Sequence, residues 1–475
     1  MRLDLTPGMR LHIIGIGGAG MSAIARVLLG RGFQVSGSDQ QGNAKTEALA
    51  TAGATIHIGH SAEFVEGADA VVVSSAVPPT NPEWVAALSR DLPVLKRADL
   101  LGELMQGTFG IAVAGTHGKT TTTGMIAHIL IECGLDPTVI LGGTLAELGG
   151  NGRFGQGPHF VIEADEYDHM FLGLRPQVAV ITNVEHDHPD LFPTAADYRV
   201  AFAHFAALLP MDGRLIICAD DPGAAELMAT LQPAGAPVIT YGLEESGGKQ
   251  LDVRALDVRP NQMGGSDFVV EMAGQSVGLA RIRLPGLHNV RNALAALVVA
   301  LELSIDFVPA CRALAGFGGV QRRFQLIGEA GGVTVIDDYA HHPTEIRATL
   351  AAARQRYPGR RLWAVWQPHT YSRTRLLSAA FAASFAQADR VVALDIYGSR
   401  ELADPGVTTA GVVALMDHPH AIHVADRRDA ADYLLERLHP DDVVLTLGAG
   451  DGDVIGRWVL EGLQEQLGSK RKSAT

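Results

Sequence analysis

The sequence predicts an α/β protein with three domains. Short β-branched runs end in glycine-rich turns and alternate with Ala- and Leu-rich stretches along the chain, as in LHIIGIGGAG (residues 11–20) and FGIAVAGTHGK (residues 109–119). Strands that read as continuous apolar runs are typical of parallel sheets covered by helices on both faces. The chain has 475 residues, which corresponds to about three domains at roughly 150 residues each.

Each of the three predicted blocks begins near an apolar strand. Residues 1–107 carry a strand, a glycine-rich loop, a helix over about residues 20–30, and a second strand that ends at Ser38-Asp39. Residues 108–324 form a second α/β unit with a less regular stretch over about 243–285, which we interpret as a small β-rich insertion. Residues 325–475 open with VTVIDDYAHHPTEI (333–346). In open α/β sheets, ligands bind outside the carboxyl ends of the strands, so we expect function at these strand ends.

Composition excludes several classes of protein. A formal net charge of −14 and a pI of about 5.7 disfavour nucleic-acid binding, which requires a basic face. Cys133, Cys218 and Cys311 are widely spaced and form no C-x-x-C pair, so a reducing compartment is favoured. Glycines break the apolar stretch after Arg10, and no run approaches the ~20 apolar residues of a membrane span. We expect a cytoplasmic protein that binds neither nucleic acid nor membrane.

The first glycine loop predicts a site for a diphosphate-containing nucleotide. Gly15, Gly17 and Gly20 satisfy the pattern G-x-G-x-x-G between a strand and a helix. Asp39 follows at about the 20 residues expected for an acid that bonds a ribose hydroxyl. A purely structural turn is the alternative, and the pattern does not select NAD over another diphosphate ligand.

The second glycine loop is a shortened phosphate-binding loop. Val113 occupies the place of the first glycine in G-x-x-x-x-G-K-[ST], yet Gly115, Gly118, Lys119 and Thr120 keep the backbone amides, the ammonium and the hydroxyl that such a loop needs. Lys119 is the only lysine between Lys96 and Lys249. The loop therefore predicts an ATP-phosphate site rather than a plain strand-to-helix turn.

Two acid-rich strand ends follow in the same block. EADEYD supplies Glu163, Asp165, Glu166 and Asp168, and NVEHDHPD supplies Glu185, His186, Asp187, His188 and Asp190. Any single carboxylate of this kind is usually a solvated loop residue, but two such clusters beside a phosphate loop predict ligands for Mg²⁺, which prefers oxygen.

The third block gathers histidines, tyrosines and arginines at strand ends. DDYAHHPTEI contains Asp337, Asp338, Tyr339, His341 and His342, and QPHTYSRT with the following Arg375 adds His369, Tyr371 and Arg373. No H-x-x-x-H or H-E-x-x-H spacing accompanies the histidine pair, so substrate recognition is favoured over metal binding or simple capping. The arginines suit a carboxylate, which a guanidinium group binds with two hydrogen bonds.

Together the motifs resemble the Mur ligase family. The matching segments, in order over about residues 9–465, are GIGGAGMS, GTHGKTTTT, EADEYD, NVEHDHPD, HNVRNALAA, GVQRRFQ, DDYAHHPTEI and QPHTYSRT. The resemblance implies a Rossmann-like UDP-sugar-binding domain (1–107), a P-loop-type central ATP-binding domain with a parallel sheet (108–324), and a C-terminal Rossmann-like domain that binds the amino acid (325–475).

The resemblance also assigns roles to residues. It implies catalytic roles for Lys119, Glu163, His188, Arg323, His341 and His369, with Thr120, Glu163 and His188 as Mg²⁺ ligands. It places ATP on Gly115, Thr116, His117, Gly118, Lys119, Thr120, Thr121, Asn289, Asn292, Arg323 and Asp338. It places the UDP-sugar on Gly15, Gly17, Gly18, Gly20, Asp39, Ser74 and His188, and L-alanine on Tyr339, His341, His369 and Arg373.

Two features depart from the family pattern. Some relatives carry Arg where this chain has Thr370, which leaves Arg373 as the expected anchor for the alanine carboxylate. Several sister ligases use a carbamoylated lysine at the second Mg²⁺. Because Lys119 is engaged by phosphate and Lys249 lies in the expected insertion, we expect no such modification here.

The implied reaction is ATP-dependent ligation of L-alanine to the lactyl carboxylate of UDP-N-acetylmuramate through an acyl phosphate, in peptidoglycan precursor synthesis. The alternative within the family is attachment of a preformed tripeptide to the same sugar during wall recycling. A nicotinamide-dependent dehydrogenase would explain only the first loop, and a regulatory NTPase would hydrolyse ATP without any amino acid. ATP and Mg²⁺ are the expected cofactors, and a monomer or weak homodimer is the expected state.

Overall fold

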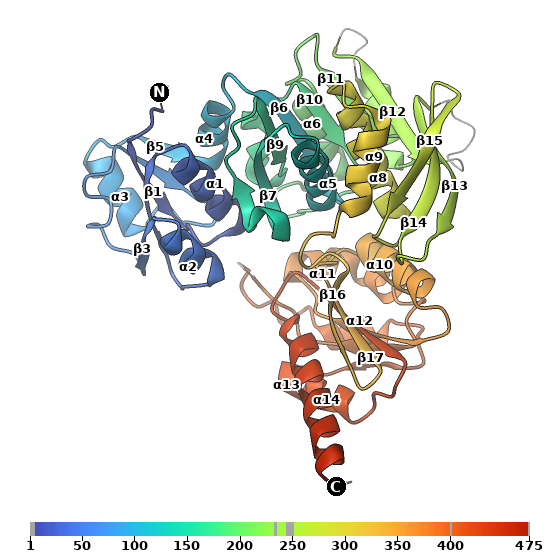
Figure 1. Cartoon of the computed structure of the whole chain (residues 1–475). Coiled ribbons are helices and arrows are strands. Elements are labelled where there is room, and N and C mark those ends of the chain that lie inside the picture. Colours follow the sequence, from blue (N-terminus) through green and yellow to red (C-terminus); the bar gives the residue numbers. More distant parts are fainter. Residues whose placement is uncertain (1–4, 232–234, 244–250, 400, 474–475) are drawn as a thin grey trace.

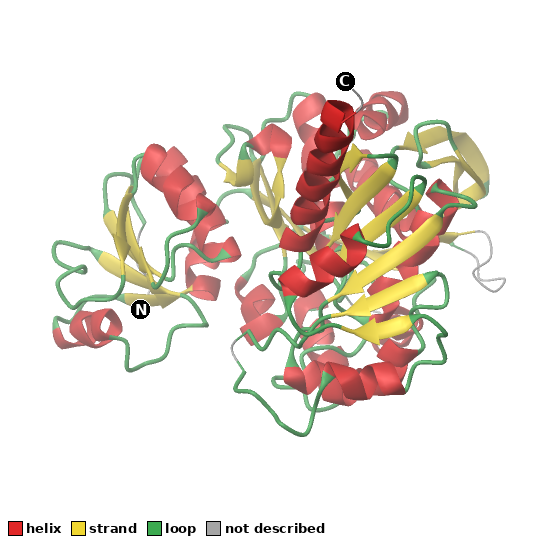
Figure 2. Ribbon diagram, turned by 90° about the horizontal axis from the view of Figure 1, so that it is seen from below, coloured by secondary structure: helices red, strands yellow, loops and turns green. Residues whose placement is uncertain are grey.

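The structure is a computed structural model that describes residues 5–231, 235–243, 251–399 and 401–473. It contains three sheets, formed in turn by the N-terminal, central and C-terminal parts of the chain. In Figure 1 the N-terminal part (blue) flanks the central part (teal to yellow), and the C-terminal part (orange to red) lies below it. Figure 2 shows the sheets covered by helices. Among the described residues, no helix combines the length and apolar character needed to cross a membrane.

The N-terminal sheet is parallel throughout, in the order β3-β2-β1-β4-β5. Its strands are β1 (Arg10–Ile14), β2 (Gln34–Asp39), β3 (Thr55–Ile58), β4 (Ala70–Val73) and β5 (Val94–Lys96). Its helices are α1 (Ala19–Gly30), α2 (Ala44–Thr51), α3 (Pro82–Ser89) and α4 (Arg97–Leu104). The side chains of Asn43 and Asn81 cap α2 and α3, and Pro82 occupies the first turn of α3. The predicted helix over 20–30 and the strand ending at Asp39 are α1 and β2.

The central sheet has the order β15-β14-β13-β12-β11-β10-β6-β9-β7-β8. Its strands are β6 (Phe109–Ala114), β7 (Thr138–Leu145), β8 (Gly150–Arg153), β9 (His159–Glu163), β10 (Val178–Ile181), β11 (Arg214–Cys218), β12 (Val238–Leu243), β13 (Val253–Pro260), β14 (Ser266–Met272) and β15 (Gln275–Ile282). Its helices are α5 (Lys119–Glu132), η1 (Ala146–Leu148), η2 (Tyr167–Gly173), α6 (Ala195–Ala206), α7 (Pro222–Thr230), α8 (Leu287–Glu302) and α9 (Phe307–Gly316).

The stretch over 243–285 is rich in strands, as predicted, and these strands belong to the central sheet. In its described part, β13 pairs in parallel with β12, and the antiparallel strands β14 and β15 extend the same sheet. Because β13 pairs with the edge of β12 that β11 leaves open, the three strands continue the hydrogen-bond ladder and share the core, with Phe268 and Ile282 in the same buried cluster as α8 residues.

The C-terminal sheet has the order β16-β17-β21-β18-β19-β20, and only the pair β16 and β17 is antiparallel. Its strands are β16 (Gln325–Ala330), β17 (Val333–Asp338), β18 (Arg361–Trp366), β19 (Arg390–Ala393), β20 (Ala421–His423) and β21 (Asp442–Leu447). Its helices are α10 (Pro343–Arg356), α11 (Tyr371–Ala382), α12 (Thr409–Ala414), α13 (Arg427–Leu435) and α14 (Val454–Ser473).

Strand order in the central sheet positions the predicted site. β6 lies between β9 and β10 and is parallel to both. The residues after these three strands are the phosphate loop, the EADEYD motif and the NVEHDHPD motif. Because parallel strands end at the same edge of a sheet, the three motifs converge there.

Candidate active site

The phosphate loop is shaped by two glycines with positive φ. Gly115 has φ of 138° and Gly118 has φ of 79°, backbone conformations that residues other than glycine rarely adopt. Gly118 is the N-cap of α5; no side chain in the described part of the protein caps this helix, and its first turn contains no acid. The first backbone amides of α5 are therefore free to bind an anion, and the helix dipole favours it.

Lys119 is the first residue of α5, and its ammonium is held by protein groups. Nζ donates to the carbonyl oxygens of Gly115 and Thr116 and lies 2.9 Å from Glu166 Oε2. Burial by itself would lower the pKa of Lys119, but the charges of Glu166, Asp165 and Glu163 raise it above its usual value. Lys119 therefore stays protonated at neutral pH.

Thr120 and Glu163 present adjacent oxygen atoms. Thr120 Oγ1 donates to Glu163 Oε1 at 2.9 Å, and Glu163 Oε2 accepts from the Gly142 amide at 2.6 Å. A hydroxyl beside a carboxylate fits Mg²⁺, which takes oxygen ligands. The third predicted ligand, His188, offers nitrogen and lies with Nε2 3.6 Å from Glu166 Oε1.

Asp187 and Arg373 form a buried ion pair between the central and C-terminal parts. Arg373 donates from Nε to Asp187 Oδ1 at 2.9 Å and from Nη2 to Oδ2 at 3.1 Å. The third nitrogen, Nη1, donates to the His369 carbonyl oxygen at 2.6 Å. Burial tends to raise the pKa of Asp187, but Arg373 holds it well below its usual range. Arg373, the predicted anchor for the alanine carboxylate, is therefore paired with the Asp187 carboxylate in this structure.

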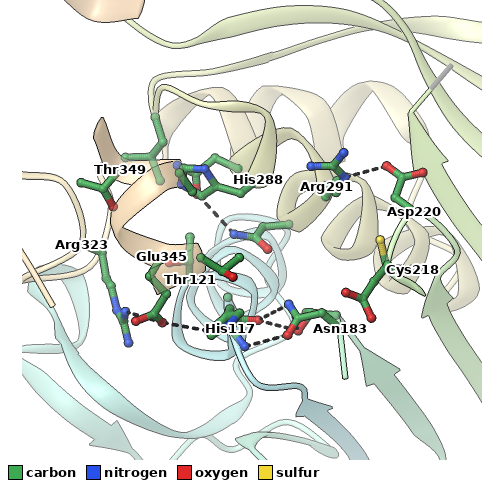
Figure 3. Close-up of a pocket in the computed structure, with 18 of the residues that line it drawn as sticks. His117, Thr121, Asn183, Cys218, Asp220, His288, Arg291, Arg323, Glu345 and Thr349 are labelled. Carbon is green, nitrogen blue, oxygen red and sulfur yellow. Dashed lines mark hydrogen bonds and ion pairs between the residues drawn. The ribbon is translucent and has the colours of Figure 1, made fainter. Parts of the chain in front are cut away.

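Two adjoining cavities lie at this sheet edge, and Gly118, Arg323 and Glu345 line both. The first, shown in Figure 3, contains the predicted ATP residues His117, Gly118, Thr121, Asn289, Asn292, Arg323 and Asp338. The second contains the predicted residues Thr116, Gly118, Lys119, Thr120, Glu163, His188, Arg323, Tyr339, His341, His369 and Arg373.

His117 joins the phosphate loop to the C-terminal part. Its ring hydrogen-bonds to Glu185 Oε2 at 2.8 Å and to Glu345 Oε1 at 3.1 Å, and Figure 3 shows Arg323, Glu345 and His117 in a row. Burial lowers the pKa of His117, but the two carboxylates outweigh it and raise the value to about 9. Side-chain atoms of His117, Glu185 and His342 lie within 4.8 Å of one another. With Glu345, they form an ion-pair network around the His117 ring.

Aromatic and charged groups of the C-terminal part face the second cavity. The guanidinium of Arg323 lies 5.0 Å from the centre of the Tyr339 ring, and His341 packs edge-on against Tyr339 and His369. Burial lowers the pKa of His341 to about 4, so this ring is neutral at pH 7. Burial also raises the pKa of Asp338 to about 6, although its carboxylate accepts from the amides of Phe324 and Ala340.

The predicted UDP-sugar residues gather at the N-terminal sheet, apart from His188 in the second cavity. Asp39 Oδ2 accepts from the Gly17 amide at 2.9 Å, so Asp39 supports the glycine loop itself. A Cβ at Gly15 would lie 3.1 Å from the Ser74 Cβ, which brings Ser74 against the same loop. Gly18 is the N-cap of α1, which lacks side-chain capping and acids in its first turn.

Several residues of the site were not singled out from the sequence. The sequence does not distinguish Glu166 from the other acids of its motif, whereas in the structure Glu166 is the partner of Lys119. Asn183 Oδ1 accepts from the His117 amide at 2.8 Å, and Glu345 accepts from the amides of His341 and His342. Only the spacing of Glu345 after His342 carried a local signal, since it forms a capping box at the start of α10. Lys249, discussed above for carbamoylation, lies outside the described residues.

Comparisons with known proteins were made over the whole chain. Three family profiles match in order: "Mur ligase family, catalytic domain" over residues 10–108, "Mur ligase middle domain" over 113–300, and "Mur ligase, glutamate ligase domain" over 322–450. The chain is 47% identical to the UDP-N-acetylmuramate–L-alanine ligase of Salinibacter ruber, covering 93% of this chain and 92% of that protein. It is 48% identical to that of Rubrobacter xylanophilus, covering 93% and 97%.

Solved structures agree with these matches. The UDP-N-acetylmuramate-alanine ligase of Thermotoga maritima superposes with a TM-score of 0.81 at 30% identity, covering 96% of this chain and 100% of that chain. A murein peptide ligase from Psychrobacter arcticus superposes with a TM-score of 0.72 at 28% identity, covering 96% and 99%.

Proposed function

The chain belongs to the Mur ligase family, and from this premise we propose that it joins L-alanine to the lactyl carboxylate of UDP-N-acetylmuramate. It is a ligase that forms an amide bond at the expense of ATP. The substrate choice rests on the identity of 47–48%, over 93% of the chain, to two UDP-N-acetylmuramate–L-alanine ligases. The convergence of three strand-end motifs at one sheet edge supports a single reaction site. The reaction serves peptidoglycan precursor synthesis, and through it cell-wall biogenesis, cell shape and division.

The two cavities are proposed to bind different parts of the substrates. The first, lined by Asn289, Asn292 and Asp338, is proposed to take the adenosine end of ATP. The triphosphate would then lie across the free amides of α5 and reach the second cavity at Lys119. Triphosphate binding places negative charge where Glu166 now neutralises Lys119, so the ammonium is expected to exchange its carboxylate partner for phosphate.

The first chemical step joins two anions. The γ-phosphoryl group of ATP passes to the lactyl carboxylate, giving an acyl phosphate and ADP. Repulsion between these groups is offset by Lys119 and by Arg323, which lines both cavities. Thr120, Glu163 and His188 are proposed to hold Mg²⁺, which when bound would neutralise phosphate charge.

In the second step the alanine amine attacks the acyl phosphate carbon, and the tetrahedral intermediate releases phosphate. The amine must first lose its proton, and His188, His341 and His369 all line the second cavity where this would happen. An acyl phosphate hydrolyses in bulk water, so the contacts of the C-terminal part with the phosphate loop, through Glu345 and His117, support a closed arrangement during the reaction.

The predicted domain limits and the remaining assignments stay proposals. We propose the ranges 1–107, 108–324 and 325–475 as the UDP-sugar, ATP and amino-acid domains, a cytoplasmic location, and a monomer or weak homodimer. Arg373 is proposed to receive the alanine carboxylate, which would require it to share or release Asp187.

A substrate screen with the full chain tests the proposal. With ATP, Mg²⁺ and UDP-N-acetylmuramate, ADP release is expected with L-alanine and not with the tripeptide, and Lys119→Ala should lower it by at least about a hundredfold. Lys45→Ala, on α2 of the N-terminal part, is the matched control. Ligation of the tripeptide would favour the recycling enzyme. ATP hydrolysis without any amino acid would favour a regulatory NTPase.

A further inference from the structure

A buried tyrosine, Tyr198, lies next to the phosphate loop. It belongs to α6, and its ring centre is 5.0 Å from that of Phe192 and 5.0 Å from that of Phe202. Buried residues recur along α6 at the spacing of one helix face, so the sequence presents Tyr198 as an ordinary core aromatic. Its hydroxyl group, in contrast, contacts two residues of the site.

Both residues that meet the Tyr198 hydroxyl also hold Lys119. Tyr198 Oη donates to Glu166 Oε1 at 3.0 Å, and Thr116 Oγ1 lies 3.2 Å from the same phenol oxygen. Lys119 Nζ donates to Glu166 Oε1 at 3.2 Å and to the Thr116 carbonyl oxygen at 3.1 Å. Tyr198 is therefore linked to the ammonium through these two residues, although it is not among the residues that line the two cavities.

The phenol keeps its proton and so remains a hydrogen-bond donor. Burial raises the pKa of Tyr198 well above its usual value, and the charges of Glu166 and Asp187 raise it further. An ionised carboxylate can only accept hydrogen bonds. The hydroxyl hydrogen of Tyr198 is therefore directed to Glu166, and a hydrogen bond to a charged acceptor is stronger than one between neutral groups.

Glu166 depends on Lys119 to compensate its charge. The Glu166 side chain is 1% exposed, and Lys119 Nζ lies 2.9 Å from its Oε2. Within the described ranges, no group donates a hydrogen bond to Oε2, and Oε1 accepts hydrogen bonds only from Lys119 and Tyr198. His188 Nε2 lies 3.6 Å from Oε1, beyond hydrogen-bond length. When Lys119 turns away, Tyr198 is thus the one hydrogen-bond donor that Glu166 keeps among these residues.

The proposed reaction requires Lys119 to turn away. Phosphate at the free amides of α5 is proposed to draw the ammonium from Glu166, and the carboxylate then stays buried without its cation. A buried charge that loses its partner is costly. A hydroxyl that continues to donate to this carboxylate lowers the cost of the exchange.

We propose that Tyr198 is a positioning residue whose hydroxyl retains Glu166 when Lys119 exchanges this carboxylate for the triphosphate. The inference rests on the proposed function and adds to it a residue that none of the motifs contains. Tyr198 acts through Glu166 and touches no substrate. Loss of the hydroxyl therefore weakens ATP binding and leaves the chemical steps intact.

Calorimetric titration of the full chain with ATP and Mg²⁺, without sugar or amino acid, tests the proposal. Tyr198→Phe keeps the packed ring and removes only the hydroxyl, so ATP binding is expected to weaken by about tenfold. Tyr433→Phe is the matched control, because its ring lies against Arg437 and Trp363 in the C-terminal part. In this control the ATP affinity should stay within about twofold of wild type.

A double-mutant cycle shows whether the hydroxyl acts through Glu166. In Glu166→Gln no buried charge remains to be stabilised, so the addition of Tyr198→Phe should change ATP affinity by less than about twofold. A merely structural role of Tyr198 predicts equal losses in both backgrounds, and that result would overturn the proposal.

Steady-state kinetics provide a second measurement. At saturating UDP-N-acetylmuramate and L-alanine, Tyr198→Phe should raise KM for ATP by about tenfold and change kcat by less than about twofold. A fall in kcat as large as the fall in kcat/KM would assign the hydroxyl to the chemical steps and overturn the proposal.

The outcomes separate this inference from the proposed function. If wild type ligates L-alanine and Tyr198→Phe binds ATP as wild type does, the role of Tyr198 is overturned and the proposed function stands. If wild type neither binds ATP nor ligates L-alanine, both fail. Should Tyr198→Phe melt below the assay temperature, Glu166→Gln decides. A carboxylate that competes with phosphate for Lys119 predicts ATP affinity in this variant at least equal to wild type, and binding weaker by about tenfold overturns the proposal.

Discussion

At the scale of single residues, the cations of the phosphate loop are paired with carboxylates. Lys119 lies against Glu166, and His117 lies between Glu185 and Glu345. The two side chains are 13% and 15% exposed, and each cation would be costly to bury to this extent without a carboxylate. We expect a phosphate group at this loop to compete with these carboxylates for the two cations.

The pairing of His117 predicts a pH-dependent stability. Its pKa is raised from 6.5 to about 9, so the stabilisation from the charged ring is fully present below pH 6.5 and is lost as the pH rises through 9. His117→Gln should therefore lower the melting temperature of the ligand-free chain at pH 6, by at least about 2 °C. The difference from wild type should shrink by pH 9.5, as measured by thermal denaturation followed by circular dichroism.

The control for this prediction is His204→Gln, at an exposed position on α6. This variant should show no comparable change of its effect with pH. A destabilisation by His117→Gln that grows as the pH rises would contradict the role assigned to the ion-pair network.

At the scale of elements, two helices begin at glycine loops, and we propose a different ligand for each. Both α1 and α5 have a glycine as N-cap and no acid in the first turn, which leaves their amides for an anion. The loops differ in their support. Asp39 holds the loop before α1, whereas Thr182 and Asn183 of the neighbouring strand end hold the loop before α5 through the His117 carbonyl oxygen.

A glycine substitution can test the first loop alone. A Cβ at Gly17 would lie 2.8 Å from Asp39 Oδ2 and 2.8 Å from Asn43 Nδ2. Gly17→Ala should therefore displace the loop and weaken UDP binding by about tenfold, with ADP binding nearly unchanged, in calorimetric titrations. Gly42→Ala is the control, because its Cβ would meet Ile58 Cδ1 at 3.6 Å and Thr46 Oγ1 at 4.0 Å, which are ordinary van der Waals contacts. Equal loss of UDP and ADP binding would show general damage instead.

At the scale of the whole molecule, ion pairs lie at both boundaries of the central part. Toward the N-terminal part, Arg97 lies 2.7 Å from Asp165 and Arg175 lies 3.6 Å from Glu103. Toward the C-terminal part, Asp187 pairs with Arg373, and their side chains are each 5% exposed. Because Asp187 and Arg373 also line the second cavity, where charged ligands are proposed to bind, we expect the C-terminal part to respond to these ligands.

Removing one partner of the buried pair should open this boundary. Arg373→Gln leaves Asp187 without its cation, a change that typically costs about 3–5 kcal/mol. The radius of gyration of the ligand-free chain, measured by small-angle X-ray scattering, is therefore expected to increase. Arg361→Gln is the control, since Arg361 pairs with Asp442 inside the C-terminal part at 2.6 Å. An unchanged radius in Arg373→Gln would mean that other contacts hold the arrangement.

Local patterns predicted much of the fold. Continuous apolar runs predicted the buried strands, the glycine loops predicted the turns before α1 and α5, and the ordered motifs predicted the family. These signals are readable because they arise from neighbouring residues, through backbone conformation and burial on both faces of a sheet. The roles of individual site residues and the domain limits stay predictions.

The sequence by itself therefore indicated several of the strands, the glycine turns before α1 and α5, and the chemical groups that follow the strand ends. Only the tertiary structure decided which groups meet. Glu166 reaches Lys119, Glu345 reaches His117, and Arg373 reaches Asp187 across 186 positions. It also decided that β13–β15 extend the central sheet. The physical reason is that these ion pairs and strand pairings join segments that are far apart in the sequence and are brought together by packing. Neighbouring residues in the chain therefore do not predict them.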